Sequence, residues 1–299
     1  MVPGPSDPAR KDIVAALNET VERRLAGDRP GTGIPRIIHQ TYFTKDLPNA
    51  LGRNVAALRA LNLDWDYRLY DDADIERFIA DEYGAAVLAR YRRISPDYGA
   101  ARADLFRYLV VYRHGGVYLD IKSGADLPFD AVLRADDSFV LSQWDNVQGG
   151  TNENWAFHPE LRDIAGGEFQ QWVIIAAPGH PFLRAVIERV LDNIDHYNPY
   201  RDGVGLNVIR VTGPITYTLA IAPLLDRHAH RQVANEHALG LRYSVMGTTT
   251  SHHTHFRGHY SRRRTPIVGA PRSDLANAPL LAFLFARSLT RRVLRRWRR

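Results

Sequence analysis

The amino-acid sequence predicts an α/β fold with a largely parallel sheet. Strand-like segments alternate with helix-like segments along most of the chain, an order typical of parallel strands joined by helices. The composition is ordinary for a globular protein, with 45% apolar and 24% charged residues in a chain of 299. A chain of this size can bury a sizeable core, so we expect one large domain.

The two ends of the chain differ from its middle. Apolar residues recur at three- and four-residue steps over residues 10–27, which predicts an amphipathic helix, and residues 28–33 are a proline- and glycine-rich linker. The last 20 residues contain seven arginines and no acidic residue. We therefore divide the chain into an N-terminal helix and linker at 1–33, one domain at 34–270 and a basic amphipathic, helical tail at 271–299.

Capping residues and glycines set the expected helix ends of the central domain. Asp71 or Asp72 can cap a helix, and Ser95 followed by proline is expected to open the next. Gly115 and Gly116 should stop that second helix just before a strand. The expected strands lie at 34–41, 65–70, 117–121, 138–144 and 172–176, and the expected helices at 73–83, 95–113, 181–197 and 214–225.

The segments AARADLFRY at 100–108 and GGVYLDIK at 115–122 carry the most informative chemistry. Asp104 and Arg107 are three residues apart, so they share one face of a largely apolar helix. Such a pair is either a partly buried salt bridge or part of a pocket wall. Asp120 lies near the carboxyl end of a short strand, where ligands bind in open α/β sheets. There it either holds a divalent cation on a diphosphate or caps the following turn.

The two segments, in this order and spacing, resemble the core motif of glycosyltransferase family 32. That family includes yeast outer-chain mannosyltransferases and bacterial capsular-polysaccharide enzymes. Weaker matches extend the resemblance over residues 34–270: IPRIIHQ at 34–40, VTGP at 211–214 and HFRGHY at 255–260. The resemblance implies the GT-A fold, an α/β sandwich that binds nucleotide sugars. It also implies retaining transfer of a sugar from a nucleotide diphosphate donor to a glycan hydroxyl, in surface or capsular polysaccharide synthesis, with manganese or magnesium.

The resemblance also assigns roles to individual residues. Asp120 would be the first aspartate of the metal motif. Asp120 is a candidate catalytic residue on this ground, and Lys122 and Asp145 are added as catalytic candidates from their own positions in the sequence. His259 is a further candidate metal ligand because histidine can bind a divalent ion. The donor would contact Ile38, His39, Gln40, Asp104, Arg107, Tyr118, His255, His259 and Tyr260.

The sequence departs from the family pattern at Lys122, which replaces the second aspartate of the metal motif. A protonated lysine cannot ligate a cation. Either Lys122 itself neutralises the diphosphate, or the metal keeps Asp120 and recruits later ligands, or Lys122 points away from the site. The chain has three lysines and 36 arginines, so arginine would be the more common basic residue at this position.

Two further segments are weaker candidates. The histidines at 252–259 can ligate a metal or donate to phosphate, or can form an ordinary polar loop. Residues 166–172 and the strand-end residue Asp145 are candidates for contact with a sugar, or belong to ordinary loops.

The tail and the composition bear on partners and location. Arginines interleaved with Leu, Phe and Trp over residues 280–299 favour an interfacial membrane segment over a helix packed on the domain. The basic residues are concentrated there, so we expect no nucleic-acid partner. The chain has no cysteine, no long apolar run and no secretory signal, so we expect a cytoplasmic enzyme, peripheral on the inner face of the membrane.

The expected partners are a UDP- or GDP-sugar donor, a glycan or lipid-linked acceptor and an anionic membrane surface. Two other classes of function remain open. One is a metal-dependent nucleotidyltransferase or nucleotide-sugar hydrolase. The other is an inactive membrane-associated scaffold with a decayed metal motif.

Overall fold

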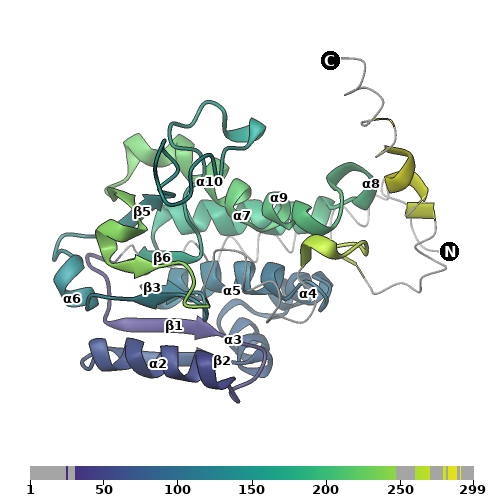
Figure 1. Ribbon diagram of the computed structural model, residues 1–299. Coiled ribbons are helices and arrows are strands. Elements are labelled where there is room, and N and C mark those ends of the chain that lie inside the picture. The colour runs from purple at the N-terminus through teal and green to yellow at the C-terminus, as the bar shows by residue number, and fades with distance from the viewer. Residues whose placement is uncertain are drawn as a thin grey trace.

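The computed structural model of the chain describes residues 31–246 and 260–269, together with Leu25 and parts of residues 279–290. The predicted fold class is confirmed: a six-stranded sheet lies between layers of helices (Figure 1). The expected helix over 10–27 lies outside the described residues, apart from Leu25, as does most of the tail.

The main sheet is largely parallel, with the strand order β2-β1-β3-β6-β5-β7. Only β6 runs against its neighbours, since it pairs antiparallel with both β3 and β5 while the other pairings are parallel. The strands are β1 (Ile37–Thr41), β2 (Asp66–Tyr70), β3 (Gly116–Leu119), β5 (Phe139–Gln143), β6 (Val173–Ala176) and β7 (Arg231–Asn235). A separate two-stranded sheet pairs β4 (Gly124–Ala125) with β8 (Leu241–Arg242).

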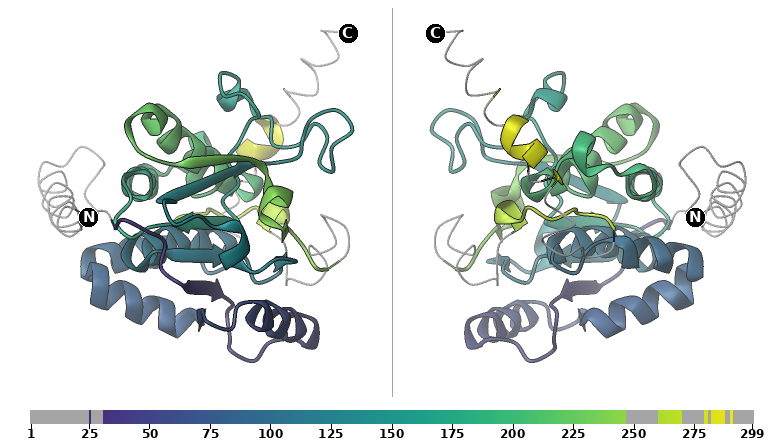
Figure 2. Two further views of the ribbon diagram at one scale, coloured as in Figure 1. Left: turned by 90° about the vertical axis from the view of Figure 1, so that its left-hand side faces the viewer. Right: turned by 90° about the vertical axis from the view of Figure 1, so that its right-hand side faces the viewer.

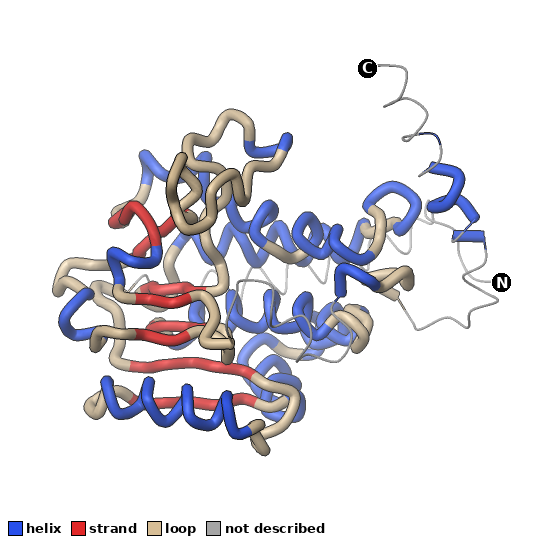
Figure 3. The backbone as a smooth tube through the Cα atoms, in the orientation of Figure 1, coloured by secondary structure: helices blue, strands red, loops and turns tan. Residues whose placement is uncertain are grey.

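Helices cover both faces of the sheet, as the blue and red segments of Figure 3 show. They are α2 (Asn49–Leu61), α3 (Asp72–Tyr83), α4 (Ala85–Arg93), α5 (Gly99–His114), α6 (Phe129–Val132), α7 (Pro181–His196), α8 (Pro199–Asp202), α9 (Val208–Val211) and α10 (Pro214–Ile221). Short 3-10 helices, labelled η, occur between them, including η1 (Pro159–Leu161) and η4 (Glu236–Leu239).

The helix starts show where local capping rules held and where they did not. α3 begins as predicted, because the Asp71 carboxylate accepts from the Asp74 N–H at 2.8 Å in a capping box. The prediction that Ser95 opens α5 was wrong. The N–H of Ser95 donates instead to the carbonyl of Ile267 at 2.9 Å, and the helix begins at Gly99. A contact distant in sequence therefore overrode a local helix-start signal.

Side-chain alternation along the strands sorts the core into two layers. Tyr118, Leu141 and Ile174 point to one face, where α3, α4, α5, α7 and α10 pack. Val117 and Ile175 point to the other, where α2, α6 and η4 pack. Figure 2 shows α2 and the α3–α5 group on opposite sides of the β1–β2 edge.

Two glycines place β3 beside β1. Gly115 ends α5 with a φ of 66°, and Gly116 begins β3 with a φ of 97°. A Cβ at Gly116 would lie 2.4 Å from the carbonyl oxygen of Ile37. No residue with a side chain fits this turn without displacing β1, so the two glycines fix the position of the strand that ends at the candidate site.

One helical stretch of the described residues, Gly205–Arg227, is long and apolar enough to cross a bilayer by length and composition. It is interrupted at Gly213, and its apolar residues are core residues: Val208, Val211, Ile215, Tyr217 and Ile221 are buried against the α5–α7 layer. The stretch is therefore accounted for as part of the domain core.

Candidate active site

Asp120 follows directly after β3 and is fixed through its backbone. Its N–H donates to the carbonyl of Trp172 at 2.9 Å, and its own carbonyl accepts from the N–H of Ser123 at 2.8 Å. Alternation along β3 puts Asp120 on the same side as Tyr118, the side covered by α5. The carboxylate therefore meets the polar residues of that helix.

Four charged side chains form a continuous cluster at this strand end. The Arg107 guanidinium lies 3.0 Å from Asp120 and 3.3 Å from Asp104, joining both carboxylates. The Lys122 ammonium lies 2.9 Å from the other oxygen of Asp120. Of the two interpretations of Asp104 and Arg107, the buried salt bridge is confirmed. Their place in a pocket wall stays a prediction.

Neutral groups complete the hydrogen bonding of Asp104 and Arg107. Asp104 accepts from the hydroxyl of Thr212 at 2.8 Å and from the amide of Gln171 at 3.2 Å. Arg107 donates to the backbone and side-chain carbonyl oxygens of Gln171, both at 2.8 Å. Its guanidinium also lies over the ring of Tyr118, 4.8 Å from the centroid. The buried charges are thus compensated from four elements of the fold.

The environment shifts the pKa of each acid in a different direction. Burial raises the pKa of Asp104, and the nearby Arg107 only partly offsets this. Burial acts in the same direction on Asp120, but Arg107 and Lys122 outweigh it and lower the pKa of that carboxyl. The pKa of Lys122 is raised because Asp120 outweighs its burial. Asp120 and Lys122 are therefore both charged at neutral pH.

Exposure divides the cluster into an inner and an outer pair. The side chains of Asp104 and Arg107 are each only 4% exposed, whereas Asp120 is 19% and Lys122 is 11% exposed. Asp120 and Lys122 are therefore the more exposed half of the cluster. Lys122 is held in place by the ring of Tyr243, whose centroid lies 4.2 Å from the ammonium nitrogen.

The described residues do not fit a divalent metal at this position. One oxygen of Asp120 faces Arg107 and accepts from the hydroxyl of Tyr118 at 3.3 Å, and the other faces Lys122. A divalent ion needs several oxygen ligands and would here lie beside two fixed cations. No group of three metal-ligating side chains occurs within the described part of the chain. His259, the other predicted ligand, lies outside it.

Of the three residues of β1 that were predicted to bind the donor, one contacts Asp120. Gln40 donates to the backbone carbonyl of Asp120 at 3.3 Å and accepts from Tyr67 at 2.9 Å. Ile38 and His39 are fully buried, as is Gln40, and their part in donor binding stays a prediction. The ring nitrogens of His39 are engaged by Tyr70 and by the carbonyl of Gly115, and burial lowers the pKa of His39 to about 3.

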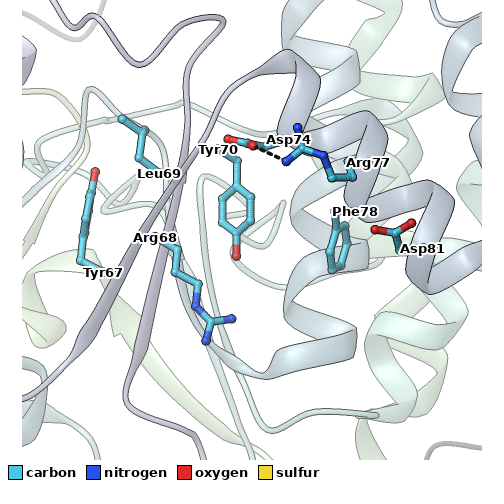
Figure 4. Close-up of a pocket in the computed structure, with 8 residues that line it drawn as sticks. All are labelled: Tyr67, Arg68, Leu69, Tyr70, Asp74, Arg77, Phe78 and Asp81. Atoms are coloured by element: carbon cyan, nitrogen blue, oxygen red, sulfur yellow. Dashed lines mark hydrogen bonds and ion pairs between the residues drawn. The ribbon is translucent and has the colours of Figure 1, made fainter.

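Figure 4 shows that successive side chains of β2 point to opposite sides of the strand. Tyr67 points to one side of the strand, and Arg68 and Tyr70 point to the other, toward Phe78 of α3. The depression between β2 and α3 is lined by charges that are already paired, such as Asp74 with Arg77 at 3.1 Å. None of the four charged residues of the cluster lines it, so we do not assign it to the site.

The remaining predicted residues fall in three places. Tyr118 contacts the cluster directly through Asp120 and Arg107. Tyr260 lies within electrostatic range of Asp104 and Asp120, and burial raises its pKa. Asp145 belongs to a loop, where its carboxylate accepts from the N–H of Thr151 at 2.7 Å. His255 and His259 lie outside the described residues.

Three residues that complete the cluster were not predicted from the sequence. Gln171 belongs to residues 166–172, a candidate segment for sugar contact, and Thr212 belongs to the VTGP match at 211–214, but neither residue was itself a candidate. Tyr243 was not noted at all. Each lies far along the chain from Asp120, and the sequence carries no spacing rule that links them.

The comparisons with known proteins concern this same region. Residues 48–139 match the family described as glycosyltransferase sugar-binding region containing DXD motif. The resemblance to the DXD-motif glycosyltransferases is confirmed. The matched segment begins at α2, ends at β5 and contains all four charged residues of the cluster.

Three individual proteins show how far the similarity extends. Inositol phosphoceramide mannosyltransferase 3 of Schizosaccharomyces pombe is 30% identical over 183 residues, which are 61% of this chain and 43% of that protein. Mannosyl phosphorylinositol ceramide synthase SUR1 of Saccharomyces cerevisiae is 28% identical over 184 residues, 61% of this chain and 40% of that protein. This chain thus spans less than half the length of either relative. The solved PaToxG glycosyltransferase is 17% identical, with a TM-score of 0.47 over 73% of this chain and 79% of that chain.

The charge cluster predicts a pH-dependent stability contribution from Asp120. Asp120→Asn should lower the free energy of unfolding at pH 7 by about 3 kcal/mol, because the buried cations Arg107 and Lys122 lose the carboxylate that they share. The folded-state pKa of Asp120 lies below its unfolded value of about 3.9. Its contribution is therefore complete above that value and is lost as the pH falls through the folded-state pKa.

Urea unfolding of wild type and variant between pH 7 and pH 3 measures this effect. The two stabilities should converge toward the acid end. Asp126→Asn is the matched control, because Asp126 pairs with Arg242 on the surface and should contribute less than about 1 kcal/mol. A stability difference that is the same at pH 3 and pH 7 would contradict the buried-cluster interpretation.

Proposed function

We propose that this chain is a retaining glycosyltransferase that moves a sugar from a nucleoside diphosphate to an acceptor hydroxyl. The observation that carries the proposal is the outer pair of the cluster. Asp120 and Lys122 present fixed opposite charges at the carboxyl end of β3, inside the segment that matches a sugar-binding region. An α/β sheet binds its ligands at such strand ends.

In the proposed reaction, the bond between the anomeric carbon and the terminal phosphate oxygen breaks. The nucleoside diphosphate leaves with the electron pair, the acceptor oxygen bonds to the anomeric carbon, and the acceptor proton passes to the leaving phosphate. Negative charge thus grows on the diphosphate as the anomeric carbon becomes electron-poor. Lys122 would stabilise the diphosphate, and Asp120 would stabilise the positive charge on the sugar. Arg107 and Asp104 act as positioning residues, because both are almost fully buried.

The relatives support a choice of donor and acceptor. Both are named as enzymes that mannosylate an inositol phosphoceramide. For this chain we propose a UDP- or GDP-sugar donor, with mannose as the preferred sugar. We further propose a glycan or lipid-linked acceptor used in surface or capsular polysaccharide synthesis.

A transferase assay tests the proposed function. The purified protein is incubated with GDP-mannose or a panel of UDP-sugars, and sugar-extended acceptor is detected by mass spectrometry. Asp120→Asn should lower turnover by roughly two to three orders of magnitude. Asp126→Asn, in the same segment but paired on the surface, should leave turnover unchanged.

The outcomes of this assay separate the other classes of function. Release of nucleoside diphosphate without extended acceptor would indicate a hydrolase. Absence of both turnover and nucleotide binding would indicate a scaffold. Either result overturns the proposal.

We also propose that Lys122 supplies the positive charge that a metal ion supplies in enzymes with two motif aspartates. Its ammonium is fixed by Asp120 and Tyr243 at the place where the second aspartate would extend. A permanent cation there can stabilise the diphosphate without an added ion. The proposal therefore predicts that wild-type turnover and nucleotide binding do not change when a chelator is added.

Substitutions at Lys122 test whether its positive charge replaces that of a metal ion. Lys122→Asp restores the two-aspartate pattern and should lose roughly a hundredfold in rate with chelator, then recover partly with manganese. Lys122→Gln is the matched control, because it removes the cation without adding a ligand and should not respond to manganese. Calorimetric binding of the nucleoside diphosphate gives a second measurement. A wild-type enzyme that requires manganese would exclude this role for Lys122.

The tail supports a proposal about location. Leu280 is buried, and the ring of Phe283 packs on Tyr200 of α8 at 5.2 Å, so the described start of the tail packs on the domain. Phe285 is 66% exposed, and six further arginines follow Arg287 in the sequence. We propose that this basic, aromatic end places the enzyme peripherally on the inner face of the membrane, near a lipid-linked acceptor.

Charge removal tests the tail without disturbing its packed start. Replacing Arg291, Arg292, Arg295 and Arg296 by Gln should weaken binding to phosphatidylserine vesicles in a sedimentation assay. Each basic residue near the surface contributes about 1 kcal/mol. The matched control replaces Arg53, Arg59, Arg77 and Arg134 of the domain by Gln. Equal vesicle binding by the tail variant and wild type would rule out the membrane role.

A further inference from the structure

Two exposed aromatic side chains lie in the connection between β5 and β6. Trp155 is 40% and Phe157 is 55% exposed, although both belong to residue types that are usually buried. This connection forms the long loops above the sheet in Figure 3. Neither aromatic residue takes part in the charge cluster, so their exposure needs a separate explanation.

The backbone on both sides of Trp155 adopts a conformation that L-residues rarely adopt. Asn154 has a φ of 63° and Ala156 a φ of 64°, and they are the two non-glycine residues with positive φ in the described part of the chain. Asparagine tolerates this region, whereas alanine is strained there. Such strain persists only where surrounding contacts impose it, and it clusters at ligand sites.

Hydrogen bonds hold the strained segment rigidly. The side-chain amide of Asn146 donates to the carbonyls of Trp155 and Gly166, each at 2.9 Å. The N–H of Glu168 donates to the carbonyl of Ala156 at 3.2 Å. The Trp155 backbone is therefore fixed before any ligand arrives.

A run of aromatic rings connects Trp155 to the charge cluster. Trp155 packs edge-to-face on Trp144, with centroids 5.3 Å apart, and Trp144 packs in the same way on Tyr243 at 5.0 Å. Tyr243 is the ring that holds Lys122. Trp155 is thus the exposed end of a packed wall that begins at the outer pair of the cluster.

We propose that Trp155 is a stacking platform for a pyranose ring of the acceptor glycan. This inference rests on the proposed glycosyltransferase function and names a part of its acceptor site. The C–H face of a pyranose is apolar and buries well on an indole, while its hydroxyls need polar partners. Asp145 and Asn154 supply such partners from the same loop.

The charge of the loop favours a glycan over an anionic membrane as the occupant. Residues 145–158 contain the acids Asp145 and Glu153 and no lysine or arginine. Two acids beside the exposed rings would repel an anionic lipid surface. They can accept hydrogen bonds from sugar hydroxyls.

Acceptor titrations of Trp155 variants test the platform. With mannobiose and mannotriose as probes, Trp155→Ala should raise the acceptor KM roughly tenfold or more, as truncation of an aromatic anchor does. The nucleoside diphosphate Kd should not change. Trp155→Phe should recover most of the loss, because it keeps a flat apolar ring.

Two further measurements keep the outcome clear. Leu63→Ala removes another exposed apolar side chain, 84% exposed and outside this loop, and should leave the acceptor KM unchanged. Saturation-transfer NMR measures mannotriose binding directly and needs no turnover. It therefore tests the role of Trp155 even if no donor is used, which separates failure of this inference from failure of the proposed function. Unchanged KM and sugar binding in Trp155→Ala would overturn the inference. The inference would also be overturned if Trp155→Ala lost binding to anionic vesicles and kept binding to the sugar.

Discussion

The buried guanidinium of Arg107 is the constraint on which the rest of the site depends. A charge that is almost fully removed from water destabilises the fold unless partners surround it. Its partners come from α5, from the end of β3 and from the connection before β6, so satisfying one charge fixes three parts of the chain relative to one another. The position of Asp120 therefore follows from a requirement of folding.

The cluster is layered from the core to the surface. Asp104 and Arg107 lie inside and are held by Thr212 and Gln171, and Asp120 and Lys122 lie outside them. Because the inner pair fixes the outer carboxylate, the outer charges hold their places without a bound ligand. Fixed charges of this kind stabilise a developing charge better than mobile ones, since they need no reorganisation during a reaction.

Strand alternation gives two neighbouring residues that were predicted to bind the donor different surroundings. His39 and Gln40 are neighbours in β1, yet His39 is enclosed among Tyr70 and Gly115 while Gln40 contacts Asp120. A sequence motif cannot distinguish these outcomes, because both residues belong to the same short match. The twofold period of the strand decides them once the packing of its two faces is known.

The sequence by itself determined the α/β class, the approximate positions of five strands and the shared helix face of Asp104 and Arg107, because these depend on local periodicity and on spacing within one helix. The glycine turn at 115–116 was also predictable, since the required backbone conformation is local. Only the tertiary structure decided that α5 begins at Gly99, that Gln171, Thr212 and Tyr243 complete the site and that Lys122 pairs with Asp120. Those features depend on contacts between distant segments, which form only when the chain excludes water from a common core.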